Sequence, residues 1–328
     1  MSTWNGKRAL VTGAGGFIGS HLAETLARHG AKVRAMVHYN ALGNYGWLDQ
    51  SDEASSIEVV TGDICDRDSV KKAMEDQEYV FHLAALIAIP YSYQAPESYV
   101  RTNIVGTLNV LQVARELRPA RIVHTSTSEV YGTARIVPIP ETHPLQGQSP
   151  YSATKIGADK LVESFNLSFN LPTVTVRPFN TFGPRQSARA VIPTIITQCL
   201  TGDSVRLGKI TPTRDLNYVS NTVSGFMAAA LSDKALGATV NLGSNREISI
   251  GDLAHVIAKI VGKSIRIDCD QQRLRPEGSE VERLWADNTQ AKALLNWEPS
   301  VSLEDGLVKT IDWMKSHMER YRPGVYVV

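Results

Sequence analysis

The stretch that decides the fold is Gly13-Ala14-Gly15-Gly16-Phe17-Ile18-Gly19, which directly follows the short apolar run Arg8–Thr12. Glycines between a strand and a helix permit a tight turn, let backbone N–H groups approach a pyrophosphate, and let the helix pack close to the strand. Apolar residues then recur every four positions over 18–29, and Gly30 lies where a left-handed cap would end a helix. This order of strand, glycine loop and helix predicts a dinucleotide-binding site.

Beyond this loop, short apolar runs alternate with longer segments of helical period. Strands are expected over 32–37, 57–61, 79–84, 121–125 and 173–177, and helices over 69–75, 99–117 and 152–169. Such alternation is typical of parallel strands joined by crossover helices. It predicts an α/β fold of the Rossmann type, with about six strands in one doubly wound parallel sheet.

The sequence pattern changes after Pro178, where Gly and Pro mark closely spaced turns between short helical stretches. We expect residues 1–178 to form the dinucleotide-binding domain. Residues 179–328 are expected to form mainly a smaller, interleaved α/β domain that binds the substrate. A segment near 214–242 is expected to return to the first domain.

The 328-residue chain has nearly balanced charges, with 34 Lys and Arg against 33 Asp and Glu. With so little net charge, the protein has no overall electrostatic field that would attract nucleic acid or an anionic membrane. An anionic substrate would therefore have to be bound by arginines placed locally. Cys65, Cys199 and Cys269 lie far apart without paired metal spacing, which favours reduced thiols over disulfides and predicts no metal site. Without a signal-peptide core or a long uncharged apolar stretch, the protein is expected to be cytoplasmic, with no nucleic-acid or membrane partner.

A second local pattern, Pro150-Tyr151-Ser152-Ala153-Thr154-Lys155, lies at the expected start of a helix. The four-residue spacing places Tyr151 and Lys155 on one face, one turn apart. An adjacent ammonium would favour the phenolate and lower the tyrosine pKa from its ordinary value of about 10. An exposed pair on an amphipathic helix is the alternative, but the glycine loop earlier in the chain favours a catalytic pair, with Tyr151 as a base.

The spacing Gly13-x-x-Gly16-x-x-Gly19, with the tyrosine and lysine pair, resembles the extended branch of the short-chain dehydrogenase/reductase superfamily. The resemblance covers nearly the whole chain, through motifs such as Arg177-Pro178-Phe179-Asn180 and Leu295-Asn296-Trp297-Glu298-Pro299. It implies a nicotinamide dinucleotide cofactor. It also implies a homodimer formed by the helices over 99–117 and 152–169.

The resemblance assigns the cofactor contacts residue by residue. Members of the superfamily commonly bind the adenosine ribose with an acid at the end of the second strand, but this chain has Val37-His38-Tyr39-Asn40 there. NAD is therefore expected, with NADP as the alternative. The residues implied to bind the cofactor are Gly13, Gly16, Phe17, Ile18, Gly19, His38, Asp63, Ile64, Leu83, Ala84, Ala85, Asn103, Thr125, Tyr151, Lys155 and Pro178.

The triplet Thr127-Ser128-Glu129 follows a predicted strand, at the edge of the sheet where ligands of open α/β folds bind. The resemblance implies that Thr127 binds the substrate oxygen that Tyr151 deprotonates. Sugar-nucleotide epimerases usually lack the carboxylate of Glu129, whereas nucleotide-sugar 4,6-dehydratases and nucleotide-glucuronate decarboxylases carry it. Ser128 replaces the Asp of many dehydratases, so Glu129 is expected to act as both base and acid.

Further positions resemble the substrate contacts of these enzymes. Asn180, Arg214 and Arg275 are expected to hold the diphosphate of a nucleotide sugar, because guanidinium donors can meet phosphate oxygens in pairs. Arg185 is interpreted equally well as a substrate contact or as a solvated surface side chain. Tyr91 is interpreted equally well as a contact of the sugar or as part of a packed aromatic loop.

The stretches 86–93 and 186–194 look like those of dehydratases from the legionaminic acid pathway. The predicted function is therefore a 4,6-dehydratase of UDP- or GDP-N-acetylglucosamine, with UDP-glucuronate decarboxylase and nucleotide-sugar C4 epimerase as alternatives.

Overall fold

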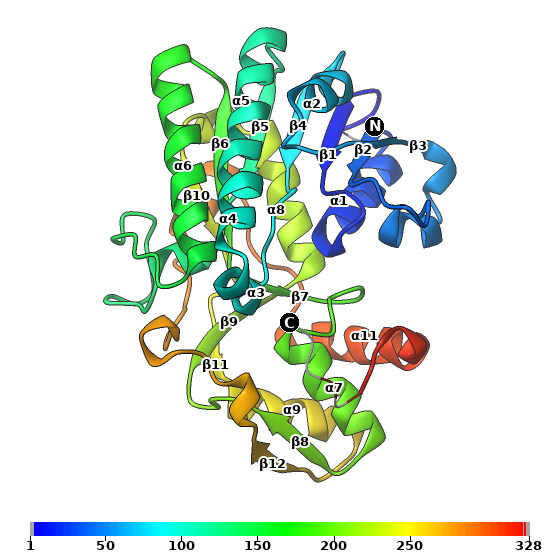
Figure 1. Ribbon diagram of the computed structural model, residues 1–328, viewed down its shortest axis with the longest axis vertical. Helices are drawn as coiled ribbons and strands as arrows, with labels where there is room; N and C mark the ends of the chain where they lie inside the picture. Colours follow the sequence, from blue (N-terminus) through cyan, green and yellow to red (C-terminus); the bar gives the residue numbers. More distant parts are fainter. Residues whose placement is uncertain (1–2, 324, 326–328) are drawn as a thin grey trace.

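The computed structural model describes residues 3–323 and 325 (Figure 1). Seven parallel strands form one large sheet in the order β10-β6-β5-β4-β1-β2-β3. The strands are β1 (Arg8–Thr12), β2 (Lys32–Val37), β3 (Ile57–Thr61), β4 (Tyr79–His82), β5 (Arg121–Thr125), β6 (Thr173–Pro178) and β10 (Thr239–Leu242). The predicted Rossmann-type α/β fold is confirmed.

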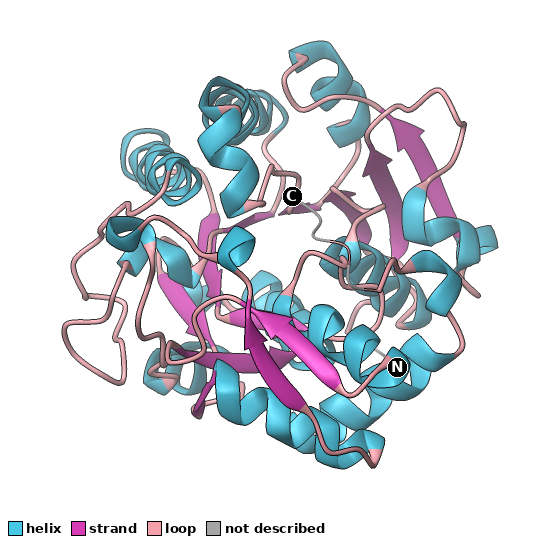
Figure 2. Ribbon diagram, turned by 60° about the horizontal axis from the view of Figure 1, so that its bottom comes forward, coloured by secondary structure: helices cyan, strands magenta, loops and turns pink. Residues whose placement is uncertain are grey.

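Helices cover both faces of this sheet, because alternate side chains of each strand point to opposite sides. Val11 of β1 packs in the cluster that includes Leu22 of α1 (Phe17–Arg28) and Phe226 of α8 (Val219–Leu231). The neighbouring Leu10 packs in a second cluster, with α2 (Arg67–Met74), α5 (Gly106–Leu117) and α6 (Pro150–Phe169). In Figure 2 helices lie along the outside of the molecule and most strands lie inside it.

The helix predicted over 99–117 is divided. A short helix α4 (Pro96–Tyr99) leads into a π-helical turn (Val100–Val105) before α5 begins. The wider turn carries Asn103, whose side chain is buried and hydrogen-bonds the backbone of Leu86 through both its oxygen and its nitrogen, each at 2.9 Å. Apolar periodicity does not reveal this turn, because it depends on a partner from another part of the chain.

The second half of the chain forms smaller units in the lower part of Figure 1. They comprise a three-stranded sheet in the order β11-β9-β7 and a two-stranded sheet, β12-β8. Their elements are β7 (Asn180–Phe182), α7 (Val191–Thr201), β8 (Ser204–Leu207), β9 (Thr213–Tyr218), β11 (Glu247–Ser249), α9 (Ile250–Val261), β12 (Arg266–Cys269) and α11 (Leu303–Lys315). Between β9 and β11 the chain returns to the large sheet through α8 and β10.

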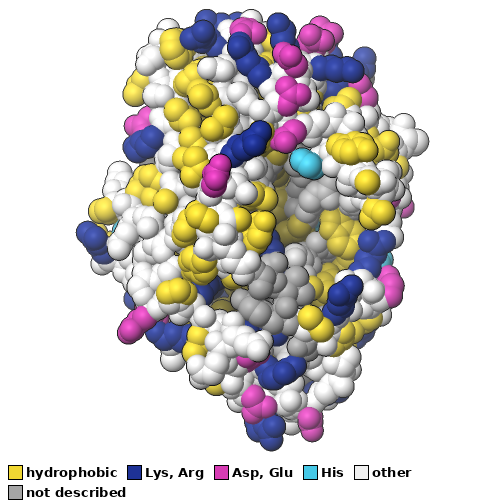
Figure 3. Space-filling model, viewed as in Figure 1, with side chains coloured by type: hydrophobic (Ala, Val, Ile, Leu, Met, Phe, Trp, Pro, Cys, Tyr) yellow, Lys and Arg dark blue, Asp and Glu magenta, His cyan; other side chains and the backbone are white. Residues whose placement is uncertain are grey.

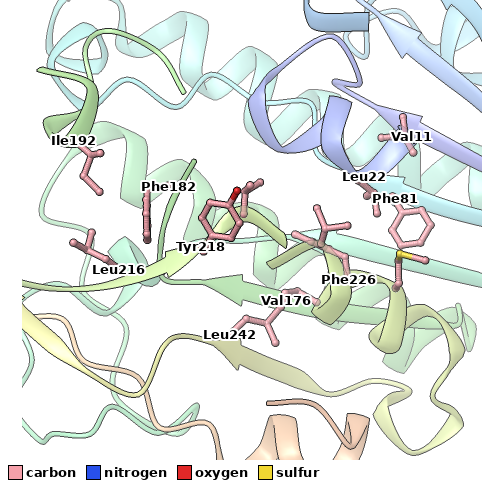
Figure 4. Close-up of a cluster of buried hydrophobic side chains, with 14 of the residues drawn as sticks. Val11, Leu22, Phe81, Val176, Phe182, Ile192, Leu216, Tyr218, Phe226 and Leu242 are labelled. Carbon is pink, nitrogen blue, oxygen red and sulfur yellow. The ribbon is translucent and has the colours of Figure 1, made fainter. Parts of the chain in front are cut away.

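The hydrophobic core is continuous between the large sheet and these smaller units (Figure 4). Phe226 and Leu242, both fully buried, belong to the same cluster as Phe182 and Leu216 of the small sheet. The two halves are therefore held together by shared apolar packing. Among the described residues no helix combines the length and apolarity needed to cross a membrane.

Candidate active site

A cavity of about 770 Å³ lies where the carboxyl ends of the large sheet face the second half of the chain. Figure 3 shows one face of the molecule hollowed between its upper and lower parts, with hydrophobic and basic side chains around the opening. The glycine loop, the ends of β4 and β5, the start of α6 and the segments after β6 and β8 all contribute to the walls. These are the places where ligands of open parallel sheets bind.

The glycine loop begins at a position where only glycine fits. Gly13 has φ +70°, and a Cβ atom there would lie 2.8 Å from the backbone nitrogen of Ala84. That nitrogen and the one of Leu83 are held by the Thr12 hydroxyl, which accepts both N–H groups at 3.1 Å. The loop and the end of β4 therefore lie against each other, and both line the cavity.

Most of the predicted cofactor residues line this cavity: Gly13, Gly16, Phe17, Ile18, Gly19, His38, Leu83, Ala84, Ala85, Thr125, Tyr151, Lys155 and Pro178. Asp63, Ile64 and Asn103 are not among the lining residues. Asp63 accepts the Cys65 N–H at 2.8 Å, Ile64 packs beneath Gly106, and Asn103 holds the Leu86 backbone. In this structure the three side chains contact neighbouring segments of the chain.

The sequence prediction missed a loop over 40–46, from which Asn40, Asn44, Tyr45 and Gly46 line the cavity. The Asn40 amide donates to the Asn44 carbonyl at 2.7 Å, and the Trp47 N–H donates to the Gly15 carbonyl at 3.1 Å. Turn-forming Asn and Gly residues were the available signal. They predict a loop but not which part of the chain it approaches.

The predicted catalytic pair lies at the start of α6. The Ser149 hydroxyl accepts the Ser152 N–H, and the Ser152 hydroxyl accepts the Ser149 N–H, forming a reciprocal cap ahead of Tyr151. Tyr151 and Lys155 are both buried to more than nine-tenths and both line the cavity. The structure thus brings the predicted pair together beside the glycine loop.

Lys155 points to the neighbouring strand. Its Nζ donates to the Thr125 carbonyl at 2.6 Å, at the carboxyl end of β5. Burial lowers the pKa of Lys155 to about 8, and the carboxylate of Asp159 opposes this change. A large fraction of Lys155 therefore carries its charge at neutral pH.

The predicted lowering of the Tyr151 pKa is wrong for this structure. Burial raises the pKa of Tyr151 well above its ordinary value, and the nearby charge of Glu129 raises it further. A hydrogen bond with Thr127 and the charge of Arg189 oppose the increase. Burial outweighs the effect expected from the lysine one turn away, because a buried phenolate loses the water that stabilises its charge.

Thr127, Ser128 and Glu129 come together with the pair. Thr127 ends the extended segment after β5 and accepts the Glu129 N–H at 3.2 Å, which begins a short 3-10 turn (Ser128–Tyr131). All three side chains are buried, and all three line the cavity. A hydroxyl, a phenol and a carboxylate therefore surround one part of the cavity, which suits proton transfers at adjacent carbon atoms.

The arginines and the asparagine predicted to contact the substrate divide into two groups. Asn180, Arg214 and Arg275 line the cavity, and Glu280 lies between the two arginines, 3.2 Å from Arg214 and 3.6 Å from Arg275. Asn180 Oδ1 and Arg275 Nη1 are buried without a hydrogen-bond partner. Arg185 lies elsewhere.

Arg185 lines a separate cavity of about 220 Å³, where it pairs with buried Glu24 of α1 at 2.9 Å and donates to Ser20. This arrangement argues against a substrate role, because the guanidinium is already paired. Tyr91 is exposed, packs near Tyr99 and does not line the large cavity.

Sequence reasoning also missed Arg189, which precedes α7. Arg189 lines the large cavity and interacts electrostatically with the phenols of Tyr99 and Tyr151. Within the described residues no carboxylate forms an ion pair with it. The only signal in the sequence was an arginine in a turn, which by itself predicts a solvated side chain.

The residues present fit a dinucleotide. The glycine loop ends at the amino terminus of α1, where backbone N–H groups favour a pyrophosphate. Thr125 Oγ1, buried without a partner, lies in the wall that also holds Tyr151 and Lys155. An oxidised nicotinamide would supply a hydride acceptor at this wall.

Among the described residues no three His, Cys, Asp or Glu side chains are grouped so as to hold a metal ion.

Comparison with known proteins agrees with this geometry. The family model for GDP-mannose 4,6 dehydratase matches residues 10–310. The chain is 31% identical to UDP-glucose 4-epimerase of Mycolicibacterium smegmatis, over 94% of this chain and 99% of the relative. It is 32% identical to UDP-N-acetyl-alpha-D-glucosaminuronate decarboxylase of Bacillus cytotoxicus, over 94% of this chain and 98% of that relative.

Among solved structures, DesIV, a dTDP-glucose 4,6-dehydratase from Streptomyces venezuelae with NAD bound, superimposes with a TM-score of 0.87. It shares 26% sequence identity, over 96% of this chain and 99% of that one. These relatives are named for different reactions on nucleotide sugars, and the comparison establishes the family and NAD as the cofactor. The chain belongs to the GDP-mannose 4,6-dehydratase family, within the NAD-dependent epimerase/dehydratase branch of the extended short-chain dehydrogenases/reductases.

Proposed function

We propose that the protein is a nucleotide-sugar 4,6-dehydratase that converts UDP- or GDP-N-acetylglucosamine to its 4-keto-6-deoxy derivative. The observation that carries the proposal is Glu129, a cavity carboxylate that is only 8% exposed. It lies close enough to Tyr151 and Arg214 to influence the pKa of each. Epimerisation at C4 requires no proton to be taken from C5, whereas elimination across C5 and C6 does.

The side chains divide the chemistry between them. Tyr151 would act as a phenolate, a form that burial disfavours and that the positive charges of Arg189 and of a bound nicotinamide would favour. It would take the proton of the C4 hydroxyl, and Thr127 would bind the same oxygen. The resulting ketone acidifies the C5 proton, which Glu129 removes. Glu129 then returns a proton to the departing C6 hydroxyl, because Ser128 offers no carboxylic acid for that step. Bound NAD would accept the hydride from C4 and supply it again at C6. The proton that Tyr151 took from the C4 hydroxyl would return at C5, so the net change is the loss of one water.

The substrate residues occupy a different part of the cavity. Arg214 and Arg275 would bind the diphosphate, with Asn180 also in this part of the cavity. Both arginines would have to exchange their ion pairs with Glu280 for the phosphate oxygens. An acetamido sugar is supported by the relative that acts on UDP-N-acetylglucosaminuronate. The product would suit the synthesis of 6-deoxy amino sugars of the legionaminic acid type.

We further propose that the enzyme is a homodimer formed by α5 and α6. Leu167 on α6 is 75% exposed, and Phe169, at the end of the same helix, and Val105, just before α5, are also exposed. Apolar side chains on neighbouring helices favour association with a second copy.

Arg189 supports a second candidate function. An arginine without a carboxylate partner, facing the same cavity as Tyr151, could bind the C6 carboxylate of a uronic acid. The enzyme would then be a UDP-glucuronate decarboxylase. Glu129 does not separate the two functions, because nucleotide-glucuronate decarboxylases also carry this carboxylate, so analysis of the product decides between them.

The test is product analysis by mass spectrometry. Wild-type protein with NAD is expected to convert UDP- or GDP-N-acetylglucosamine to a product lighter by one water. Glu129→Gln is expected to lower this turnover by about 10²–10⁴-fold. Glu298→Gln, which removes an exposed carboxylate paired with Lys292 away from the cavity, is the matched control and should leave turnover unchanged.

Three outcomes would contradict the proposal. Release of carbon dioxide from UDP-glucuronate would identify a decarboxylase. Interconversion at C4 without change of mass would identify an epimerase. Absence of water loss from every hexosamine nucleotide tried would exclude the dehydratase.

A further inference from the structure

A buried carboxylate that does not line the cavity lies directly behind the catalytic pair. Asp159 on α6 is 5% exposed, and both of its oxygens are hydrogen-bonded. His124 Nε2 lies 3.1 Å from Oδ1. Oδ2 accepts from the Ser126 hydroxyl at 2.7 Å and from Arg177 Nη2 at 3.0 Å. The mechanism proposed above does not use this group.

These contacts join the elements that carry the catalytic residues. Asp159 follows Lys155 by one helical turn and Tyr151 by two, so the three side chains share a face of α6. Its partners lie on β6, on β5 and immediately after β5, where Ser126 directly precedes Thr127. One carboxylate therefore joins α6 to β5, to β6 and to the residue that directly precedes the catalytic triplet.

We propose that Asp159 is a positioning residue for Tyr151 and Lys155, and that its negative charge keeps the Lys155 amine protonated. This inference rests on the roles proposed above for the pair. It assigns Asp159 no contact with the substrate.

The charges around Lys155 support the electrostatic part of the proposal. The titratable groups that face it or lie on the elements packed against it are His82 of β4, His124 of β5, Arg177 of β6, Glu129 of the 3-10 turn, and Tyr151 and Asp159 of α6. Burial lowers the pKa of both histidines, so they are neutral at pH 7. Burial by itself would raise the pKa of Asp159, but His124, Arg177 and Lys155 hold it below its ordinary value. Asp159 is thus the anion that opposes deprotonation of Lys155.

If Asp159 had only a structural role, removing its charge would leave the pKa of Lys155 unchanged. The protonation of Lys155 as a function of pH therefore distinguishes the two roles. Acetic anhydride acetylates only the neutral amine, and the Lys155 peptide can be quantified by mass spectrometry as a function of pH. In wild-type protein half-maximal labelling is expected near pH 8, because the pKa of Lys155 is about 8. A fully buried lysine without an opposing anion would titrate near pH 5–6. A wild-type midpoint below about pH 6 would overturn the proposal without any variant.

The variant that removes the charge is Asp159→Asn, which keeps the shape of the side chain. Its labelling midpoint is expected to fall by about one pH unit or more, a tenfold change in the ratio of neutral to charged lysine. Asp215→Asn is the matched control, since Asp215 is a fully buried carboxylate on β9, held by Ser244 and Ala286. That variant should leave the Lys155 midpoint unchanged.

A folded Asp159→Asn protein with the wild-type midpoint would overturn the proposal, even if its turnover fell. Should Asp159→Asn fail to fold, the wild-type midpoint decides. Labelling needs no nucleotide sugar, so this test can fail or succeed independently of the proposed reaction.

Discussion

Tyr151 and Lys155 belong to the same wall of the cavity, yet burial moves their pKa values in opposite directions. Desolvation disfavours the charged form of each side chain, so the phenol holds its proton more tightly and the ammonium more weakly. Spacing on the helix therefore predicts that the two residues act together, but it does not predict their protonation. The positive charge of Arg189, a residue distant in sequence, opposes the rise for Tyr151.

Replacing Tyr151 by Phe should abolish most of the turnover without preventing NAD binding. The expected loss in kcat is about 10²–10⁴-fold, because the substitution removes the proton acceptor and leaves the glycine loop intact. NAD affinity, measured by titration calorimetry, should change little. Tyr79→Phe is the control, since that phenol lies 3.1 Å from Lys7, at the amino end of β4, and does not line the cavity. Turnover near the wild-type level in Tyr151→Phe would exclude Tyr151 as the base.

Replacing Arg275 by Gln should weaken nucleotide-sugar binding. A charge-assisted hydrogen bond contributes about 1.5–3 kcal/mol, so KM should rise by about tenfold or more while kcat changes little. Arg246→Gln removes an exposed arginine paired with Glu304 and is the matched control. A fall in kcat with unchanged KM would contradict a role in binding the diphosphate.

At the scale of the element, the glycine loop is the segment that we propose binds the cofactor. Its shape depends on contact with the end of β4, where Thr12 holds the backbone of Leu83 and Ala84. The loop at 40–46 closes over the same site from a different part of the chain. Only the first of these elements has a pattern that sequence alone can identify.

Gly13→Ala tests the close approach within this element. The new Cβ would lie 2.8 Å from Ala84 N at a residue with positive φ, so the free energy of unfolding should fall by about 1–3 kcal/mol and NAD affinity should be largely lost. Gly262→Ala is the matched control, because that residue also has positive φ but no atom within 4 Å of the new Cβ. It should cost about 1–2 kcal/mol of stability and leave NAD affinity unchanged. Equal NAD affinity in both variants would show that the contact with Ala84 is unimportant.

At the scale of the whole molecule, burial of charged and titratable groups makes stability depend on pH. Arg185 and Glu24 join the segment after β7 to α1, and His21 lies in the same small cavity. Burial lowers the pKa of His21 to about 4, with the charge of Arg185 as the second cause. Burial also lowers the pKa of His82 and His124. The folded protein therefore holds three neutral histidines that would be protonated after unfolding in mild acid.

The sign of the effect follows from proton binding. Below the unfolded pKa of about 6.5 the unfolded state binds more protons at these histidines, so stability is lost as the pH falls. Asp215 has the opposite effect, because its pKa is raised to about 6 and the folded state binds the extra proton between about pH 4 and 6. The prediction is thus confined to the interval above pH 6.

Urea denaturation at pH 7 and pH 6 should show a loss of about 2 kcal/mol in the free energy of unfolding. His21→Gln should reduce this difference by about a third, since one of three histidines no longer contributes. Unchanged or higher stability at pH 6 would contradict the buried neutral histidines.

The sequence by itself determined the Rossmann-type fold, the glycine loop and the pairing of Tyr151 with Lys155. These features depend on local spacing, because alternation of strands and helices and a four-residue interval set which neighbouring side chains share a face. The motif Thr127-Ser128-Glu129 was also visible, since it directly follows a strand. The tertiary structure alone decided that Arg185 pairs with Glu24, that Arg189 faces the cavity, and that Asp159 ties α6 to two strands. Partners and desolvation come from residues far away in sequence, so local spacing cannot specify them.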